Sequence, residues 1–285
     1  MKLRAAAKIN LMLDIFSKTD DGYHSLFMIM QSVSLYDDIT VTDNDAGVIR
    51  VSCSRGDLPS DMSNTAYKAA SLYSCLAGIR PGFDIFIQKN IPAAAGLAGG
   101  SADAAAVIKA LSVMHPCDAD TKQLDAIAEQ VGADVPFCLH GGTKAAFDKG
   151  QVLADIPPLF SCFAVLVKPD IDVSTGLAYS LFDSAQNVRH LKTDLMLHAC
   201  VRQNKEDVCA YAGNVFEQFV EVHDRPYIKS VMRKYGSFLE CMSGSGPTVY
   251  GLFDDEKSAC LAASELKKTY SQVYVCTPVN EGVLI

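Results

Sequence analysis

The sequence contains no Cys-x-x-Cys pair, although ten of its 285 residues are cysteines. Neighbouring cysteines are at least nine residues apart, so the ligand spacing of a structural zinc site is missing. Several cysteines lie within apolar runs, as Cys162 does in Ser-Cys-Phe-Ala-Val-Leu-Val. We therefore expect buried, reduced thiols and a reducing compartment.

The chain also lacks an apolar run of about 18 residues, the length that a membrane helix needs. Its start, Met1-Lys2-Leu3-Arg4, does not have the pattern of a signal peptide. The net charge is −8 and no basic stripe occurs, which disfavours a nucleic-acid-binding protein. An acidic protein can still bind an anionic substrate through local basic groups and helix ends. We expect a cytoplasmic protein that acts on a small molecule, without nucleic-acid or membrane partners, as a monomer or loose homodimer.

Two common nucleotide-binding motifs are absent as well. No Gly-Lys-Ser/Thr follows a glycine loop, and no Gly-x-Gly-x-x-Gly of the dinucleotide type occurs. Instead, the glycine-containing run 92–102 leads into an alanine-rich helical pattern that reaches Met114, with Ser101 as the predicted N-cap and Asp103 in the first turn. Such a loop directs unpaired N–H groups and the positive end of the helix dipole to one place. It predicts an anion site, most often for phosphate, and a plain tight turn is the alternative.

The length suggests two domains or one large one, and 49% hydrophobic residues suffice for an ordinary core. Pro157-Pro158 marks a composition break, which gives domains 1–154 and 155–285. Periodicity predicts strands at 3–16, 32–42, 48–53, 83–88, 143–147, 163–167, 238–242, 249–253 and 273–278. It predicts helices at 62–76, after the glycine loop, and at 121–131, 176–182, 214–219, 226–235 and 256–268, and a polar, largely helical stretch at 184–210. The fold class is α+β, and the second half has the order of a ferredoxin-like sandwich.

Three polar residues of the first half could line a site. Lys8 and Asn10 lie two apart on a predicted strand, so their side chains share one face, which is either a pocket wall or a solvent-facing edge. Lys89 directly precedes the glycine loop, where its charge could meet a phosphate or an adenine ring. A solvated lysine at a strand end is the plainer interpretation.

Two further positions have a structural and a functional interpretation. Tyr23 and His24 follow a polar turn and could stack on a ring and hydrogen-bond to it, or could be ordinary structural residues. Asp134 stands between a helix that ends at Gly132 and an apolar segment. It could cap the next turn or, if it faces phosphates, serve as a general base.

A second glycine loop, Ser243-Gly244-Ser245-Gly246-Pro247, lies between two predicted strands. With Ala7-Lys8-Ile9-Asn10-Leu11 and the loop Gly96–Ser101, it stands in the order and spacing of the galacto-, homoserine, mevalonate and phosphomevalonate (GHMP) kinase superfamily. The chain resembles this superfamily over essentially its whole length. Asp21-Gly22-Tyr23-His24 and Gly132-Ala133-Asp134-Val135-Pro136-Phe137 resemble one branch, whose members phosphorylate the 2-hydroxyl of a cytidine-diphosphate sugar alcohol in non-mevalonate isoprenoid synthesis.

The resemblance implies a two-domain kinase that uses ATP and Mg²⁺. Its N-terminal domain would be a ribosomal-protein-like β/α unit, its C-terminal domain a ferredoxin-like sandwich, and the active site would lie between them. The positions that match the ATP site are Asn64, Lys89, Pro92, Ala93, Ala94, Ala95, Gly96, Leu97, Ala98, Gly99, Gly100, Ser101 and Ala102. Ser243, Gly244, Ser245 and Gly246 match the supporting glycine loop.

The resemblance also implies roles in catalysis and in acceptor binding. Asp134 would take the proton of the acceptor hydroxyl, and Lys8 would steady the charge that develops during phosphoryl transfer. Tyr23 and Tyr179 would enclose the cytosine and His24 would hydrogen-bond its edge, while Asn10 and Thr175 would touch the sugar-alcohol end. The alternatives are a GHMP kinase of mevalonate, homoserine or sugar type, or a nucleotide-binding sensor without catalysis.

The main loop departs from the pattern of the branch at two positions. Ala98 stands where glycine is usual, and Ala102 where serine is frequent. The Cβ of Ala98 disfavours a positive φ, so the loop geometry depends on the backbone at this residue. The missing hydroxyl at 102 leaves Ser101 as the expected magnesium ligand.

Overall fold

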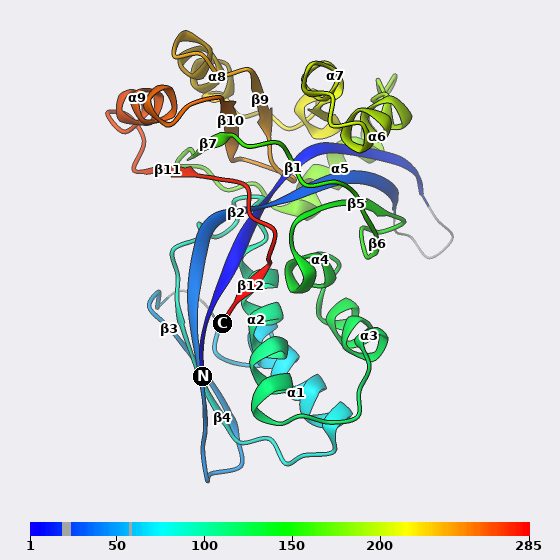
Figure 1. The fold of residues 1–285 in the computed structure, drawn as a ribbon, viewed down its shortest axis with the longest axis vertical. Helices are drawn as coiled ribbons and strands as arrows, with labels where there is room; N and C mark the ends of the chain where they lie inside the picture. Colours follow the sequence, from blue (N-terminus) through cyan, green and yellow to red (C-terminus); the bar gives the residue numbers. More distant parts are fainter. Residues whose placement is uncertain (19–23, 57–58) are drawn as a thin grey trace.

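The computed structural model describes residues 1–18, 24–56 and 59–285. In this part of the chain a large sheet has strand order β12-β1-β2-β4-β3, with β5, β6 and β8 attached beside this path. A second, four-stranded sheet has the order β11-β7-β10-β9. Figure 1 shows β3, β4 and four helices in one half of the molecule and the second sheet in the other, with β1 and β2 running between the halves.

The first two strands connect the halves. β1 (Lys2–Lys18) and β2 (His24–Asp43) form a long antiparallel ribbon, and Leu11, Met12 and Leu13 near its middle are all buried. Its register shifts at three points, one of them between Asn10 and Met12. Such irregularities bend a strand and increase its twist, and the ribbon curves from the large sheet into the other half (Figure 1).

The rest of the large sheet is assembled around this ribbon. β4 (Phe83–Gln88) is antiparallel to β2 and parallel to β3 (Ile49–Cys53), while β5 (Thr143–Phe147) pairs with β2 and β6 (Val152–Asp155). β8 (Gly213–Asn214) and β12 (Val283–Leu284) both pair with β1. Segments from the second half of the sequence therefore complete the first sheet, and the domain limits at 154 and 155 remain a proposal.

Four helices lie together on one side of this sheet (Figure 1): α1 (Thr65–Ala77), α2 (Gly99–Met114), α3 (Thr121–Val131) and α4 (Val135–His140). α2 contacts α1, α4 and β1, and its alanines 104, 105 and 106 are fully buried. Small side chains let neighbouring backbones approach closely, so the alanine run allows α2 to pack tightly against these three elements. α1 begins after Asn64, whose side-chain oxygen accepts from the Ala66 N–H at 2.9 Å.

The second sheet consists of β7 (Phe163–Lys168), β9 (Leu239–Met242), β10 (Val249–Phe253) and β11 (Gln272–Cys276). Its strands pair antiparallel in the spatial order fourth, first, third, second. α8 (Arg225–Lys234) and α9 (Glu256–Leu266) pack on it around Val165, Met232 and Phe253. This arrangement confirms the predicted ferredoxin-like sandwich and the α+β class.

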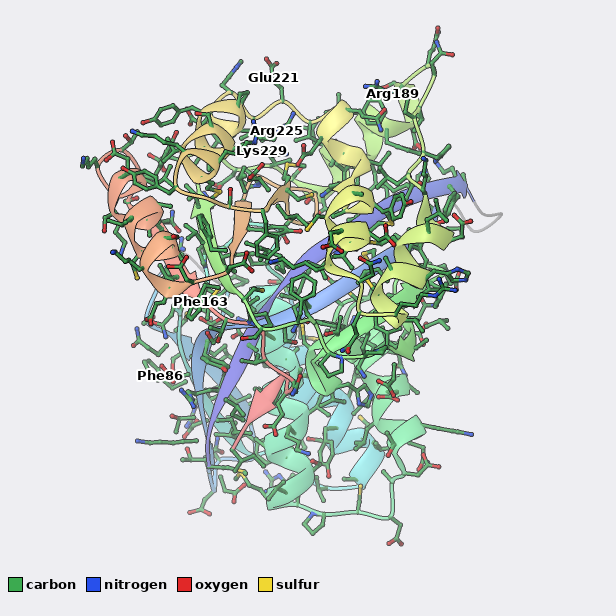
Figure 2. All side chains as sticks on the ribbon, turned by 45° about the horizontal axis from the view of Figure 1, so that its top comes forward. Phe86, Phe163, Arg189, Glu221, Arg225 and Lys229 are labelled. Atoms are coloured by element: carbon green, nitrogen blue, oxygen red, sulfur yellow. The ribbon has the colours of Figure 1, made fainter. Side chains whose placement is uncertain are left out.

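Between β7 and α8 the chain forms α5 (Thr175–Ser184), α6 (Thr193–Val201), α7 (Lys205–Tyr211) and the 3₁₀ helix η1 (Val215–Gln218). Glu217 of η1 accepts hydrogen bonds from Lys229 Nζ and from the backbone N–H of Met242. Lys229 lies beside Arg225 on α8 (Figure 2), and Arg225 donates to the Glu217 carbonyl. These bonds fix the end of β9, directly before the second glycine loop.

Most predicted elements are confirmed, with four differences. Helix α4 has no predicted counterpart, because in the sequence its six residues form only an apolar segment. β2 begins at His24 instead of residue 32, and the helix predicted at 214–219 is a short 3₁₀ turn. The short strands β6, β8 and β12 have no predicted counterpart, because two to four residues carry too little alternation. The cysteines are free, and five of them are buried. No helix in the described ranges is both long and apolar enough to cross a membrane.

Candidate active site

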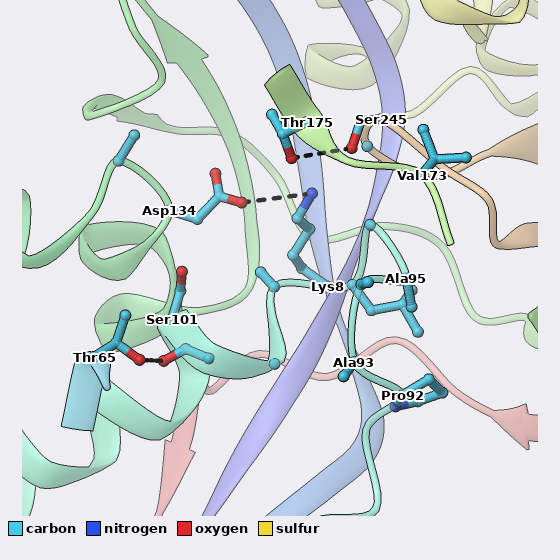
Figure 3. A pocket seen from close by; sticks show the side chains of 18 of the residues that line it. Lys8, Thr65, Pro92, Ala93, Ala95, Ser101, Asp134, Val173, Thr175 and Ser245 are labelled. Carbon is cyan, nitrogen blue, oxygen red and sulfur yellow. Dashed lines mark hydrogen bonds and ion pairs between the residues drawn. The ribbon is translucent and has the colours of Figure 1, made fainter. Parts of the chain in front are cut away.

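A cavity of about 540 Å³ lies where the two halves meet (Figure 3). The predicted site residues that line it are Lys8, Asn64, Lys89, Asp134, Thr175, Tyr179, Gly244, Ser245 and the whole run 92–101. Of the predicted residues that the structure describes, Asn10, His24, Ala102, Ser243 and Gly246 lie behind or beside this lining. Tyr23 falls outside the described residues.

The start of α2 gives the cavity its anion-binding end. α2 begins at Gly99 after Ala98, which has φ 58° and no side-chain group that could cap the helix. The prediction of Ser101 as N-cap and of Asp103 in the first turn is therefore wrong, because the N-cap is Ala98 and the helix begins three residues earlier than predicted. The first N–H groups of a helix have no acceptor within it, so Gly99, Gly100 and Ser101 offer donors at the cavity. Ala102 is fully buried and faces the core instead.

Ala98 is the position where the sequence departs from the kinase pattern, and its backbone is left-handed. A residue with a Cβ pays roughly 1–2 kcal/mol for this conformation. We expect Ala98→Gly to raise the free energy of unfolding by about 1 kcal/mol, since glycine removes most of that strain. Ala102→Gly, in the regular part of α2, is the matched control and should lower it by about 1 kcal/mol or more. Denaturant titration of the two variants checks both signs, and a destabilised Ala98→Gly protein would contradict the strain.

The two glycine loops contact each other through their backbones. A Cβ on Gly96, which has φ +73°, would lie 2.1 Å from the carbonyl oxygen of Ser243, and one on Gly244 would lie 2.9 Å from the carbonyl oxygen of Gly96. Ser243 Oγ donates to that Gly96 carbonyl at 2.9 Å. The buried amide of Asn214 donates to the carbonyls of Met242 and Gly244 at 2.8 and 2.7 Å. The second loop therefore holds the first in place from behind.

Lys8 and Asp134 face each other across the cavity (Figure 3). Lys8 Nζ is 3.7 Å from Asp134 Oδ2, and the two side chains are 4% and 30% exposed. Lys8 also donates to Asn10 Oδ1 at 2.7 Å, which confirms that these residues share a face. Asn10 Oδ1 in turn accepts from the backbone N–H of Gly244 at 2.9 Å. Asn10 thus joins Lys8 to the second glycine loop from beneath the cavity wall.

The end of the cavity formed by α5 is aromatic. Tyr179 of α5 stacks on His24 with ring centroids 5.1 Å apart, and it meets Phe216 edge-on at 5.3 Å. Burial, with a smaller effect of nearby Asp134, raises the pKa of Tyr179 to about 12. His24 Nε2 lies 2.6 Å from Asp183 Oδ1, a partner that the sequence analysis did not identify. Thr175 Oγ1 is 3.3 Å from Ser245 Oγ, so α5 and the second glycine loop adjoin here (Figure 3).

The structure contradicts the plainer interpretation of Lys89 as a solvated lysine. Its side chain is only 4% exposed and forms ion pairs with Asp37 and Asp103, the latter at 2.8 Å. Burial lowers its pKa, but the two carboxylates outweigh burial and raise the pKa overall. The sequence carried a signal for Asp37, which alternates with Leu35 and Ile39 on the buried face of β2.

Comparisons with known proteins first identify the class of protein to which this chain belongs. The model of the GHMP kinases N terminal domain matches residues 64–142, and the model of the GHMP kinases C terminal matches residues 223–272. A solved homoserine kinase from Cytophaga hutchinsonii has the same fold, with a TM-score of 0.80 at 18% identity over 99% of this chain and 96% of its own. Fold and site together define a GHMP-type small-molecule kinase.

Full-length relatives narrow this class. The 4-diphosphocytidyl-2-C-methyl-D-erythritol kinase of Clostridium beijerinckii is 41% identical over 280 residues, which cover 96% of this chain and 99% of its own. That of Acetivibrio thermocellus is also 41% identical, with 96% and 98% covered. A crystal structure of 4-(cytidine 5'-diphospho)-2C-methyl-D-erythritol kinase superposes with a TM-score of 0.82 at 32% identity, over 98% of this chain and 99% of that chain. The chain belongs to the 4-diphosphocytidyl-2-C-methyl-D-erythritol kinase family.

Proposed function

We propose that this protein transfers the γ-phosphoryl group of ATP to the 2-hydroxyl of 4-diphosphocytidyl-2-C-methyl-D-erythritol, a step of the non-mevalonate pathway to isoprenoids. The observation that supports this most is the presence of Lys8, Asp134 and the start of α2 in one cavity. Phosphoryl transfer requires alignment and charge stabilisation more than covalent chemistry from the protein. These three elements supply a base, a cation and phosphate-binding N–H groups.

In the proposed mechanism, Asp134 accepts the proton of the attacking hydroxyl. Lys8 lies beside it and offsets the negative charge that develops on the transferring group. Because Lys8 is buried and bonded to Asn10 Oδ1, its ammonium group is held in place before the substrates bind. The N–H groups at the start of α2 hold the phosphates, and Tyr179 and Thr175 border the acceptor end.

The reaction would use Mg²⁺, and the oxygen donors that line the cavity suit this ion. The hydroxyl of Ser101 and the carboxylate of Asp134 both line the cavity and are hard donors. Residues 1–18, 24–56 and 59–285 contain no group of three or more His, Cys, Asp or Glu that could hold a metal ion. The ion would therefore be coordinated mainly by phosphate oxygens and water, with Ser101 and Asp134 beside it. When bound, Mg²⁺ would neutralise charge on the β- and γ-phosphates.

A substrate panel tests the proposal. We expect ATP-dependent ADP release with 4-diphosphocytidyl-2-C-methyl-D-erythritol, and a kcat/KM at least about 100-fold lower for mevalonate and homoserine, which lack the cytosine that the aromatic end would hold. Efficient turnover of mevalonate or homoserine would retain the class of kinase and refute the acceptor. ATP binding without turnover of any alcohol would indicate a sensor instead.

A further inference from the structure

Lys89, Asp37 and Asp103 form a buried ion cluster directly under the loop 92–98. Their side chains are 4%, 0% and 5% exposed, so the cluster is almost completely shielded from water. Asp37 belongs to β2, Lys89 follows β4, and Asp103 lies in the second turn of α2. Three separate elements therefore meet at one ammonium group.

The cluster holds both ends of the loop. At its entry, Asp37 Oδ1 accepts the backbone N–H groups of Asn90 and Ile91 at 2.6 and 2.8 Å. At its exit, Asp103 is bonded to Lys89 Nζ at 2.8 Å. A Cβ on Gly99 would lie 3.1 Å from that same Nζ, so the ammonium group sits against the first residue of α2.

The backbone of the loop between these two ends is strained. Ala94 and Ala98 have φ values of 48° and 58°, and each left-handed residue with a Cβ is strained by roughly 1–2 kcal/mol. Strained segments persist where the surroundings over-determine them. The cluster supplies that restraint at the entry and the exit, while the second glycine loop supplies it in the middle.

The charges also argue against a simple phosphate-binding role for Lys89. Two carboxylates surround it, so its positive charge is already compensated before a nucleotide arrives. Burial, reinforced by Asp37 and opposed by Lys89, raises the pKa of Asp103 well above its ordinary value. Asp103 Oδ1 is buried and has no hydrogen-bond partner among the described residues. A lysine with this environment holds structure in place better than it attracts an anion.

We propose that Asp37, Lys89 and Asp103 act as one positioning group, which fixes the loop 92–98 so that the N–H groups at the start of α2 face the nucleotide phosphates. Asp37 does not touch the cavity, so its effect on ATP passes through Lys89 and the loop backbone. This inference rests on the proposed use of ATP. It is independent of the identity of the acceptor alcohol.

Asp37→Asn is the decisive variant, because it nearly keeps the size of the side chain while it removes the negative charge and replaces one of the two acceptor oxygens with an NH₂ donor. Direct titration with ATP should show a dissociation constant raised about tenfold or more, since a misplaced binding element is costly even when the change is remote. The KM for the acceptor should stay unchanged. Asp45→Asn is the matched control: Asp45 lies in the turn after β2, is exposed, and should leave ATP binding as in the wild type.

If Lys89 acted only by contacting ATP, Asp37→Asn would have the opposite effect on ATP binding. Removing the charge of Asp37 would then free the ammonium group, and ATP would bind as tightly as before or more tightly, which would overturn the proposal. An equal weakening of ATP and of acceptor binding would overturn it as well, since that indicates general unfolding.

If Asp37→Asn fails to fold, Asp103→Asn alone tests the exit of the loop and should also raise the dissociation constant of ATP. Where both single variants fold, the double variant Asp37→Asn/Asp103→Asn tests whether the two carboxylates act together. Members of one ion cluster are not additive, so the double variant should weaken ATP binding by clearly less than the product of the two single effects. Multiplicative effects would show that the residues act separately and would contradict the proposal. Because ATP binding is measured without acceptor, a failure of the proposed acceptor leaves this readout intact.

Discussion

Replacing Asp134 with asparagine is expected to lower kcat by about 10²–10⁴-fold, the usual contribution of a positioned general base. The side chain nearly keeps its size, but it loses its negative charge and with it the ability to take the proton. ATP binding should change much less than kcat, because the N–H groups at the start of α2, which we propose bind the phosphates, remain in place. Steady-state kinetics with the cytidine acceptor and a direct titration with ATP measure the two effects separately.

Asp125→Asn is a matched control for this experiment. Asp125 is on α3, pairs with His140 at 2.7 Å and lies outside the cavity, so its variant should retain full turnover. A kcat for Asp134→Asn within about threefold of wild type would exclude the carboxylate as base, since general base catalysis is worth far more. The cavity would then need another group to accept the proton.

The second large effect is expected at Gly96. In Gly96→Ala the new Cβ would meet the Ser243 carbonyl oxygen at 2.1 Å, and this is backbone that cannot turn away as a side chain can. The residue also has φ +73°, where a Cβ adds further strain. Overpacking and strain together should lower the free energy of unfolding by about 3 kcal/mol or more. ATP binding should weaken as well, because the two glycine loops must separate.

Gly56→Ala tests whether this effect belongs to the contact between the loops. A Cβ at Gly56 meets nothing within 4 Å, and we expect stability within about 0.5 kcal/mol of the wild type. Denaturant unfolding followed by ATP titration compares the two variants. A Gly96→Ala protein that unfolds and binds ATP like the Gly56→Ala protein would show that the loops do not need their close approach.

Features carried by neighbouring residues were predictable from the sequence. The helix after the glycine loop follows from its alanines and its periodic apolar residues, and the shared face of Lys8 and Asn10 follows from strand alternation. The antiparallel hairpin around the second glycine loop is likewise a local pattern, and the structure has it as β9 and β10. In these cases the residues that decide the geometry stand within a few positions of each other.

Features that depend on distant partners were not predictable in the same way. Asp37 meets Lys89 from 52 positions away, and alternation could place it on the buried face without naming its partner. The pairing of β12 with β1 joins opposite ends of the chain through two residues, too few to leave a pattern. The helix start was misplaced because Ala98 adopts a left-handed backbone that propensity disfavours, and tertiary contacts of the loop outweigh that preference.

The position of the phosphate on the product tests the proposed function most directly. The protein would be incubated with ATP, Mg²⁺ and 4-diphosphocytidyl-2-C-methyl-D-erythritol, and the product examined by phosphorus and carbon NMR. We expect one new phosphomonoester signal with coupling to carbon 2 of the erythritol, formed by the wild type and nearly absent with Asp134→Asn. Phosphate on another hydroxyl, or ADP release without a phosphorylated product, would contradict it.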